Sequence, residues 1–248
     1  MRRAGCDAAR FTLFIFAMAV VPFAGREASA DLILAWDLLG AGGDEASIAA
    51  TTQNFAGPAA SLTRGPGLIA IALTNGFNSN GFTAAGTIAN ATANGDYYQF
   101  SFTTPSDTVM SFSDLDANFR RTNLAPNTFQ WQYNIGAGFV GIGSPFSFTG
   151  LDTNGTNQPD IILSGISDLQ NVAPGSSVTF RLLAAGANNF SPQFGIGRLS
   201  GNDLVLNGSM SSVPEPTSLA LGAFGAAVFG AAWRRRTRSE PTSCDTAV

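Results

Sequence analysis

The chain has 248 residues and a formal net charge of −4, and it contains no histidine, no lysine and only two cysteines. Without histidine, the Ser-His-Asp and Cys-His catalytic groups and the usual zinc sites are excluded. Residues 31–213 contain five arginines and twelve acidic residues, a net charge of −7. Because phosphate binding needs clustered cations, this composition argues against a nucleic-acid partner.

Residues 1–30 have the pattern of a secretory signal peptide. Arg2, Arg3 and Arg10 form a basic start, residues 11–23 are apolar, and Ala28 and Ala30 are the small residues of a signal peptidase site. The apolar run is too short for a comfortable membrane span. We therefore expect cleavage after Ala30. Since Cys6 lies in this segment and Cys244 near the C-terminus, the mature domain is expected to have no disulfide.

Residues 31–212 form one predicted domain. Charged residues make up 12% of the chain and it holds 28 glycines, a composition typical of strands joined by tight turns. Polar and apolar residues alternate at 97–104, 112–120 and 128–135, and further strands are predicted at 32–37, 68–73, 146–148, 160–166, 177–183, 193–199 and 204–210. Residues 75–95 are predicted to be a long irregular connection. About ten strands at this spacing predict an all-β fold, an antiparallel two-sheet sandwich of jelly-roll type.

The segment 152–160 is a candidate calcium loop. Oxygen atoms of Asp152, Asn154, Asn157 and Asp160 can converge on one hard cation. The segment does not fit the EF-hand pattern, because its glycine comes too early and no closing glutamate follows. Asn, Asp and Gly are also the residues of ordinary turns, so a plain turn is the alternative. No other cofactor is expected.

Four aromatic residues are candidates for carbohydrate binding: Trp36, Tyr97, Trp131 and Tyr133. A ring exposed on a sheet can stack on a sugar while amides and carboxylates bond its hydroxyls. Trp131 and Tyr133, however, share a strand face with Phe129, which is typical of a core strand. For this pair, burial competes with ligand stacking.

Asp114 and Asp116 share a strand face and are a candidate pair for a glycosidase, which needs two carboxylates across a cleft. The alternation that buries Leu115 points these acids outward, where Arg120 or Arg121 can pair with them. We therefore expect no catalytic residues and no enzymatic activity. The alternative is a secreted hydrolase that acts on polysaccharide through paired carboxylates.

Residues 213–238 combine a stiff tether, an apolar span and a basic cluster. Pro214, Glu215 and Pro216 favour extended backbone because each proline fixes φ and restricts its predecessor. Residues 216–233 carry no charge and, as a helix, measure about 26 Å, enough for one transmembrane helix. The arginines that follow mark the cytoplasmic side: Arg234, Arg235, Arg236 and Arg238. Residues 239–248 form a predicted cytoplasmic tail.

This order of features resembles the PEP-CTERM sorting signal of exported bacterial proteins. The resemblance implies recognition by an exosortase, a membrane-embedded cysteine protease or transpeptidase, with removal of the helix and transfer toward the cell surface or exopolysaccharide. An ordinary C-terminal membrane anchor is the alternative. The middle region also resembles a β-sandwich domain recurrent in secreted PEP-CTERM proteins, through folding motifs that include Trp36, residues 62–68 (Leu-Thr-Arg-Gly-Pro-Gly-Leu) and residues 119–121 (Phe-Arg-Arg).

The sequence thus predicts a protein that is exported and anchored in the inner membrane through its C-terminal helix before processing. Its destination is then the cell surface or the extracellular matrix. The expected role of the domain is structural, adhesive or glycan-binding, with an exosortase and extracellular polysaccharide as partners.

Overall fold

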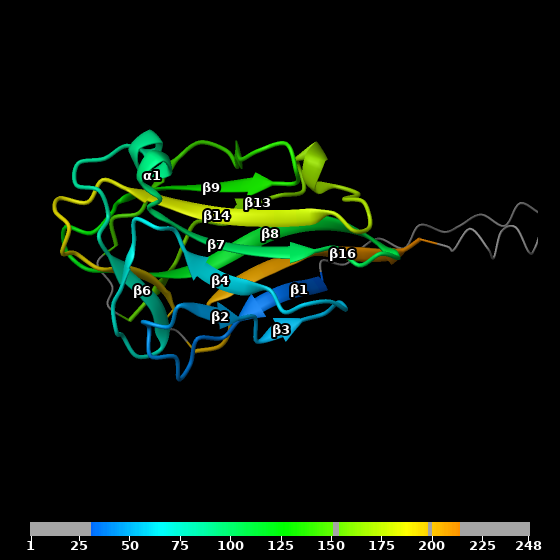
Figure 1. Cartoon of the computed structure of the whole chain (residues 1–248), viewed down its shortest axis with the longest axis horizontal. Helices are drawn as coiled ribbons and strands as arrows, with labels where there is room; N and C mark the ends of the chain where they lie inside the picture. Colours follow the sequence, from blue (N-terminus) through cyan, green and yellow to red (C-terminus); the bar gives the residue numbers. More distant parts are fainter. Residues whose placement is uncertain (1–30, 151–153, 198–199, 214–248) are drawn as a thin grey trace, which may run out of the picture.

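The computed structural model describes residues 31–150, 154–197 and 200–213. They form two antiparallel sheets packed face to face, which confirms the predicted all-β sandwich (Figure 1). Its jelly-roll connectivity stays a prediction. The nine-stranded sheet has the order β3 (Thr52–Gln53), β1 (Asp31–Trp36), β16 (Leu204–Ser212), β8 (Thr108–Arg121), β15 (Phe194–Gly197), β6 (Gly76–Asn80) and β5 (Ile69–Ala70), with β12 (Thr156–Asn157) and β13 (Ile161–Ile162) also paired to β8. The seven-stranded sheet has the order β10 (Val140–Gly141), β9 (Thr128–Asn134), β14 (Ser177–Ala185), β7 (Tyr97–Thr103), β4 (Ser61–Arg64) and β2 (Ser47–Ala49), with β11 (Phe146–Ser147) paired to β9.

Aromatic side chains fill the space between the sheets. The predicted alternation is confirmed on β7 and β9, where every second side chain is buried. Phe100 of β7 stacks on Phe180 of β14 at 5.4 Å between ring centroids, and Phe119 of β8 packs on Phe129 of β9 at 5.2 Å. Such pairs add about 0.5–1.5 kcal/mol beyond the burial of their area. Phe119 and Phe129 come from different sheets, so phenylalanine pairs of this kind contribute to the packing between the sheets.

The segment 75–95, predicted to be irregular, contains two regular elements, so this prediction is wrong. Strand β6 buries the polar residues Asn78 and Ser79, which give no apolar alternation in the sequence. Helix α1 (Ile88–Asn94) has only seven residues, too few for a helical period, and is delimited by a capping box between Thr87 and Asn90. Its Ala91 packs against β14 in a small cluster outside the main core.

The Arg-Gly-Pro-Gly segment that carried the family resemblance has a folding role in the structure. Arg64 donates hydrogen bonds to the carbonyl oxygens of Gly43 (2.6 Å) and Asn78 (2.8 Å), and its guanidinium lies 3.5 Å from the centre of the Phe77 ring. Gly67 lies so close to the end of α1 that a Cβ there would approach the Asn94 carbonyl oxygen to 2.4 Å. Arg64 thus links both sheets, and Gly67 permits the helix to dock.

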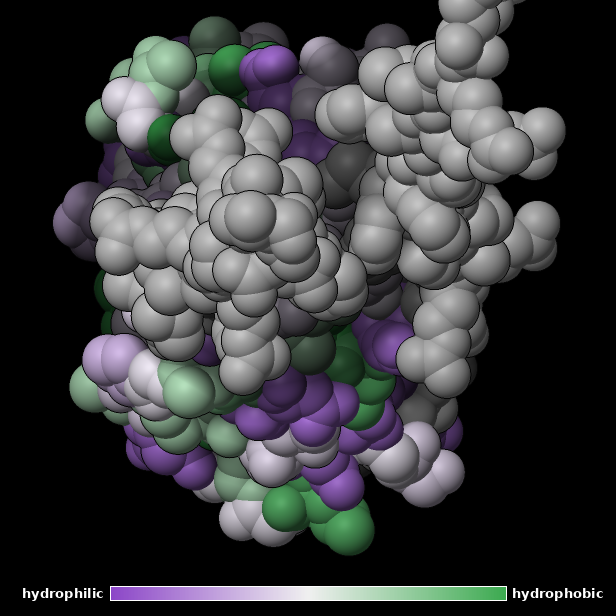
Figure 2. Space-filling view, turned by 90° about the vertical axis from the view of Figure 1, so that its right-hand side faces the viewer, coloured by the Kyte–Doolittle hydropathy of each residue, from purple (hydrophilic) through white to green (hydrophobic). Residues whose placement is uncertain are grey.

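The first and last described residues lie at the same end of the sandwich (Figure 1). Asp31 of β1 is opposite Gly208 of β16, and β16 continues along β8 until Ser212 is opposite Thr108. Because both terminal strands pair within the sheet and the main core is drawn from residues 33–206, we treat residues 31–213 as a self-contained folding unit. Figure 2 shows this end of the molecule, where hydrophilic and hydrophobic residues are intermixed on the described surface.

No helix within the described ranges is long and apolar enough to cross a membrane. The predicted signal peptide, transmembrane helix and tail lie outside those ranges.

Candidate functional site

A hollow of about 330 Å³ lies beside the middle of β8. It is polar because the side of β8 that faces away from the core presents Asp116 and Asn118 between the inward residues Leu115, Ala117 and Phe119. The segment around β12 and the turn before β16 complete the walls. The lining residues are Asp116, Ala117, Asn118, Asn157, Gln158, Asp160, Ser200, Asn202, Asp203 and Val205.

We call this space the acidic hollow, and its surroundings change the pKa of Asp116. Burial raises the pKa of Asp116, and the neighbouring carboxylates of Asp114 and Asp160 raise it further. Asp114 is itself fixed by hydrogen bonds from the Ser113 hydroxyl (2.6 Å) and the Asn207 amide (2.7 Å). The arrangement therefore favours a proton or another cationic or hydrogen-bonding partner at Asp116.

Asp203 also lines the hollow, but its carboxylate is hydrogen-bonded within the protein. It is 1% exposed, and its carboxylate accepts hydrogen bonds from the Leu38 backbone nitrogen (3.0 Å) and the Asn118 amide (3.4 Å). The polar side chains left to contact a ligand are those of Asp116, Asn157, Asp160, Ser200 and Asn202. The calcium-loop pattern grouped Asn157 with Asp160, but the sequence did not predict that Asp116 of β8 lies beside them, because this proximity depends on strand pairing.

The predicted pairing of Asp114 or Asp116 with a neighbouring arginine is wrong. Arg120 donates to the side-chain oxygens of Asn78 and Gln193, each at 3.3 Å. Arg121 donates to the backbone oxygens of residues 125 and 126, each at 2.6 Å, and so holds a turn. The acceptors of both guanidiniums therefore belong to the fold and are not the acids of β8.

Two of the four predicted calcium ligands reach the acidic hollow. Asn157 and Asp160 line it, Asn154 is exposed at the start of the same segment, and Asp152 lies outside the described residues. Calcium takes 6–8 oxygen ligands. Among the residues that the structure describes, no group of three or more acidic, histidine or cysteine side chains is placed to hold a metal ion. Calcium binding therefore stays a prediction of the loop sequence.

The structure corrects the carbohydrate prediction for three of the four rings. Trp36, Trp131 and Tyr133 are 0%, 1% and 4% exposed. The indole nitrogens donate to the Ile48 carbonyl oxygen (3.0 Å) and to the Gln158 side chain (2.8 Å), respectively. A sugar cannot stack on a ring that has no exposed face. These rings are buried because their side chains lie on the inward face of their strands.

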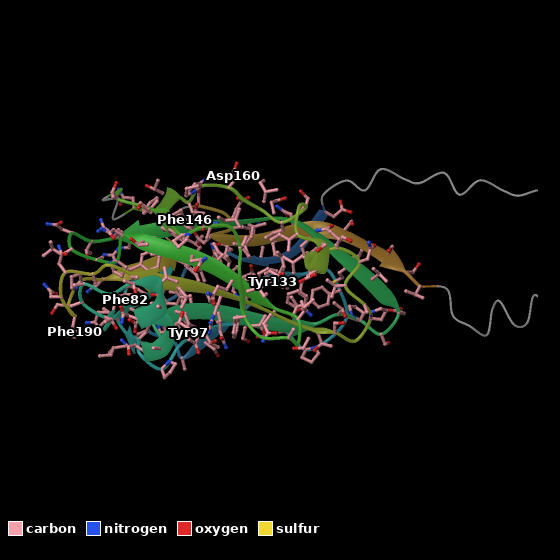
Figure 3. All side chains as sticks on the ribbon, turned by 90° about the horizontal axis from the view of Figure 1, so that it is seen from above. Phe82, Tyr97, Tyr133, Phe146, Asp160 and Phe190 are labelled. Carbon is pink, nitrogen blue, oxygen red and sulfur yellow. The ribbon has the colours of Figure 1, made fainter. Side chains whose placement is uncertain are left out.

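Tyr97, the fourth ring, lies half-buried on the outer face of the seven-stranded sheet. Figure 3 places it on the opposite face of the sandwich from Asp160. Beside Tyr97 is Arg181 of β14, whose guanidinium carbon is 5.3 Å from the centre of the Tyr97 ring and 3.5 Å from that of Phe139. Phe139 comes from the turn between β9 and β10 and is 37% exposed.

Two polar rows run across the same outer face. One row joins Gln132, Arg181, Gln99 and Thr63 on four neighbouring strands. The other joins Asn134, Thr179, Ser101 and Ser61, and within it the hydroxyls of Thr179 and Ser101 are 2.8 Å apart. We call this surface, together with Tyr97 and Phe139, the amide face. It offers neutral hydrogen-bonding groups, one cation and two rings, a combination suited to sugar recognition.

The sequence did not identify Arg181 or Phe139 as site residues. Arg181 was one polar position in an alternating strand, and Phe139 lay in a glycine-rich turn. Their contact depends on how the β9–β10 turn folds back over β14, which strand alternation does not determine.

The residues of the predicted sorting signal, from Pro214 to Arg238, lie outside the described residues, as do Ala28 and Ala30. They begin one residue after Val213, whose backbone nitrogen donates to the Asp107 carbonyl oxygen at 2.7 Å. The folded domain therefore continues up to the start of the signal.

Comparison with known families gives a match at this junction. No curated protein matches the chain. Residues 212–236 match the family model described as the PEP-CTERM protein-sorting motif. The resemblance inferred from Pro214, Glu215, Pro216 and the arginine cluster is thereby confirmed. The chain carries a PEP-CTERM sorting motif that begins at the last residue of β16, the final strand of a two-sheet antiparallel β-sandwich.

Proposed function

We propose that this protein is an exosortase substrate whose β-sandwich is released to the cell surface or exopolysaccharide matrix and binds glycan there without catalysis. The observation that carries the export and sorting part is the sorting motif at residues 212–236. The motif starts where β16 ends, so cleavage near Pro214 removes no strand from either sheet.

Glycan binding is assigned to the amide face. Its two rows supply amide and hydroxyl groups at the spacing of neighbouring strands, about 4.8 Å. Tyr97 and Phe139 supply ring surface at its edge. These are the groups that recognise sugars, and the core does not need the row residues, since they point away from it.

Processing is tested in cells with and without the exosortase. We expect the intact mass of the wild-type protein to lack the segment after the Pro-Glu-Pro tether when the exosortase is present, and to retain it when the enzyme is deleted. The double variant Pro214→Ala, Pro216→Ala should stay full-length in both strains. A wild-type mass that keeps the segment in both strains would instead mean a permanent membrane anchor.

Glycan binding is tested with the folding unit 31–213 on exopolysaccharide purified from the producing cells. We expect retention of the wild-type domain and weaker retention of the double variant Tyr97→Ala, Ser101→Ala. The matched control is Asp160→Asn, on the opposite face of the sandwich. A wild-type domain that is not retained would rule out the glycan-binding part while leaving sorting intact.

A polysaccharide hydrolase is the second candidate. The observation that favours it is the acidic hollow, where Asp116 has a raised pKa beside Asp160. A glycosidase needs one protonated and one ionised carboxyl group facing each other across the scissile bond. The hollow is small for a ligand pocket, and none of its lining residues is aromatic, so it offers no ring for a sugar to stack on. We therefore prefer glycan binding at the amide face to hydrolysis in the hollow.

The hydrolase is tested by the release of reducing ends from the same exopolysaccharide. Hydrolysis that is lost in both Asp116→Asn and Asp160→Asn would establish it. Hydrolysis that survives both substitutions would point to a contaminant.

Calcium binding is tested by isothermal titration of the folding unit. If the wild-type protein releases no heat at millimolar calcium and Asn157→Ala gives the same trace, the calcium prediction is wrong.

A further inference from the structure

Arg181 lies on the outer face of the sheet but is more buried and has more contacts than a typical surface arginine. The residue is 9% exposed, and its guanidinium lies between the Phe139 ring at 3.5 Å and the Tyr97 ring at 5.3 Å. Its Nε donates a 2.8 Å hydrogen bond to the Gln132 side-chain oxygen. Contacts with two rings and one hydrogen bond restrict the motion of the guanidinium, which lowers the entropy cost of using its fork of donors.

This fixed cation has no counter-ion within the described residues. On neighbouring strands it faces Gln132 and Gln99, and along its own strand Thr179 and Leu183, all of them neutral. The only hydrogen bond that the described residues give the guanidinium is the one to Gln132. The terminal nitrogens have no hydrogen-bond partner among the described residues and are not completely enclosed by the protein. Burying a charge without a partner costs free energy of folding. The domain has twelve acidic residues, but none that the structure describes pairs with Arg181.

We propose that Arg181 binds the carboxylate of a uronic-acid unit in an acidic polysaccharide. The terminal nitrogens donate two parallel hydrogen bonds to the carboxylate oxygens, as guanidinium and carboxylate groups match in geometry. Phe139 borders the sugar ring, and the hydroxyls and amides of Gln99 and Thr179 bond its hydroxyl groups. The inference deepens the proposed glycan binding at the amide face and rests on it.

The chemistry of the face selects this ligand among anions. Arg181 is the single cation in two rows of neutral side chains, and the domain as a whole carries a net charge of −7. Tight binding of a nucleic acid or a polyphosphate needs clustered cations, which these two rows do not supply. One isolated fork instead suits one carboxylate per sugar unit, with the remaining contacts made to uncharged groups.

The experiment measures binding of the folding unit 31–213 to polygalacturonate and alginate, with dextran as the neutral polymer and dextran sulfate as the sulfated one. We expect the wild-type domain to bind the two uronate polymers more tightly than either dextran. Arg181→Lys keeps the charge but loses the fork, and should raise the Kd for uronate polymers about tenfold or more, since a hydrogen bond to a charged group is worth about 1.5–3 kcal/mol.

Two further variants separate ligand binding from folding. Gln132→Glu places a carboxylate against Nε and should compete with the uronate, giving a similar loss of affinity while keeping or improving thermal stability. Asp116→Asn removes a charge in the acidic hollow on the other sheet and should leave the affinity for uronate polymers unchanged. Thermal unfolding of each variant checks that the fold is intact.

Each contrary outcome has a separate meaning. Equal binding to dextran and to uronates, with no effect of Arg181→Lys, would overturn the uronate inference and leave glycan binding standing. Preference for dextran sulfate would overturn the carboxylate assignment. Loss of binding in Asp116→Asn but not in Arg181→Lys would move the site to the acidic hollow. No binding to any of the four polymers would overturn this inference, and retention on exopolysaccharide from the producing cells then decides separately whether the glycan-binding function stands.

Discussion

The raised pKa of Asp116 makes the stability of the folded domain depend on pH. Burial and two neighbouring carboxylates raise its pKa, so the folded protein binds a proton at Asp116 more readily than the unfolded chain does. Above the raised pKa, the ionised carboxylate destabilises the folded state. As pH falls through that value toward the ordinary carboxyl value of 3.8, protonation removes the penalty.

We therefore expect Asp116→Asn to raise the free energy of unfolding at neutral pH by about 0.5 kcal/mol, a value kept small because the side chain is partly solvated. The gain should vanish below the ordinary carboxyl pKa, where aspartic acid is neutral in both states. Urea unfolding at the two pH values measures it. Asp31→Asn, which removes an exposed carboxylate at the start of β1, is the control for net charge. An equal gain at both pH values would contradict the electrostatic explanation.

At the scale of elements, the sequence predicted the long alternating strands and some of the short ones, but it predicted neither β6 nor α1. Strands β7 and β9 were predicted because each buries every second side chain. Strand β6 and helix α1 were not, because a buried strand rich in Asn and Ser and a helix of seven residues carry no periodic apolar signal. Their positions are instead set by partners distant in sequence, above all Arg64 and Gly67.

The docking of α1 can be tested at Gly67. A Cβ at this position would lie 2.4 Å from both the Asn94 carbonyl oxygen and the Asp96 carboxylate, so the helix end must move. We expect Gly67→Ala to lower the free energy of unfolding by about 1–3 kcal/mol, the usual cost of overpacking. Gly165→Ala, where no atom lies within 4 Å of the new Cβ, is the control and should be nearly neutral. Thermal or urea unfolding distinguishes the two, and equal stability of both variants would mean that α1 is not tightly packed.

For the whole molecule, the position of the chain ends determines what faces outward. Asp31 and Val213 lie at one end of the sandwich, and Phe190 lies at the opposite end (Figure 3). A domain tethered through residue 213 therefore presents the end with Phe190 away from its attachment point, while the amide face runs along the side.

This orientation can be tested with single cysteines, because residues 31–213 contain none. Phe190 is 65% exposed and Ala184 is 0% exposed. We expect a membrane-impermeant maleimide added to intact cells to label Phe190→Cys and to leave Ala184→Cys unlabelled until the protein is unfolded. Labelling of Phe190→Cys only after cell lysis would contradict the surface location.

The sequence by itself determined the sorting motif and the fold class. Both depend on local patterns: the Pro-Glu-Pro tether, the uncharged span and the arginines are contiguous, and strand alternation is visible within a few residues. Only the tertiary structure decided which polar and aromatic residues meet. Burial of Trp36 and Trp131, the grouping of Asp116 with Asp160, and the seating of Arg181 between Tyr97 and Phe139 all follow from pairings between distant strands. Alternation places a side chain on one of two faces, but the register and order of the strands select its neighbours.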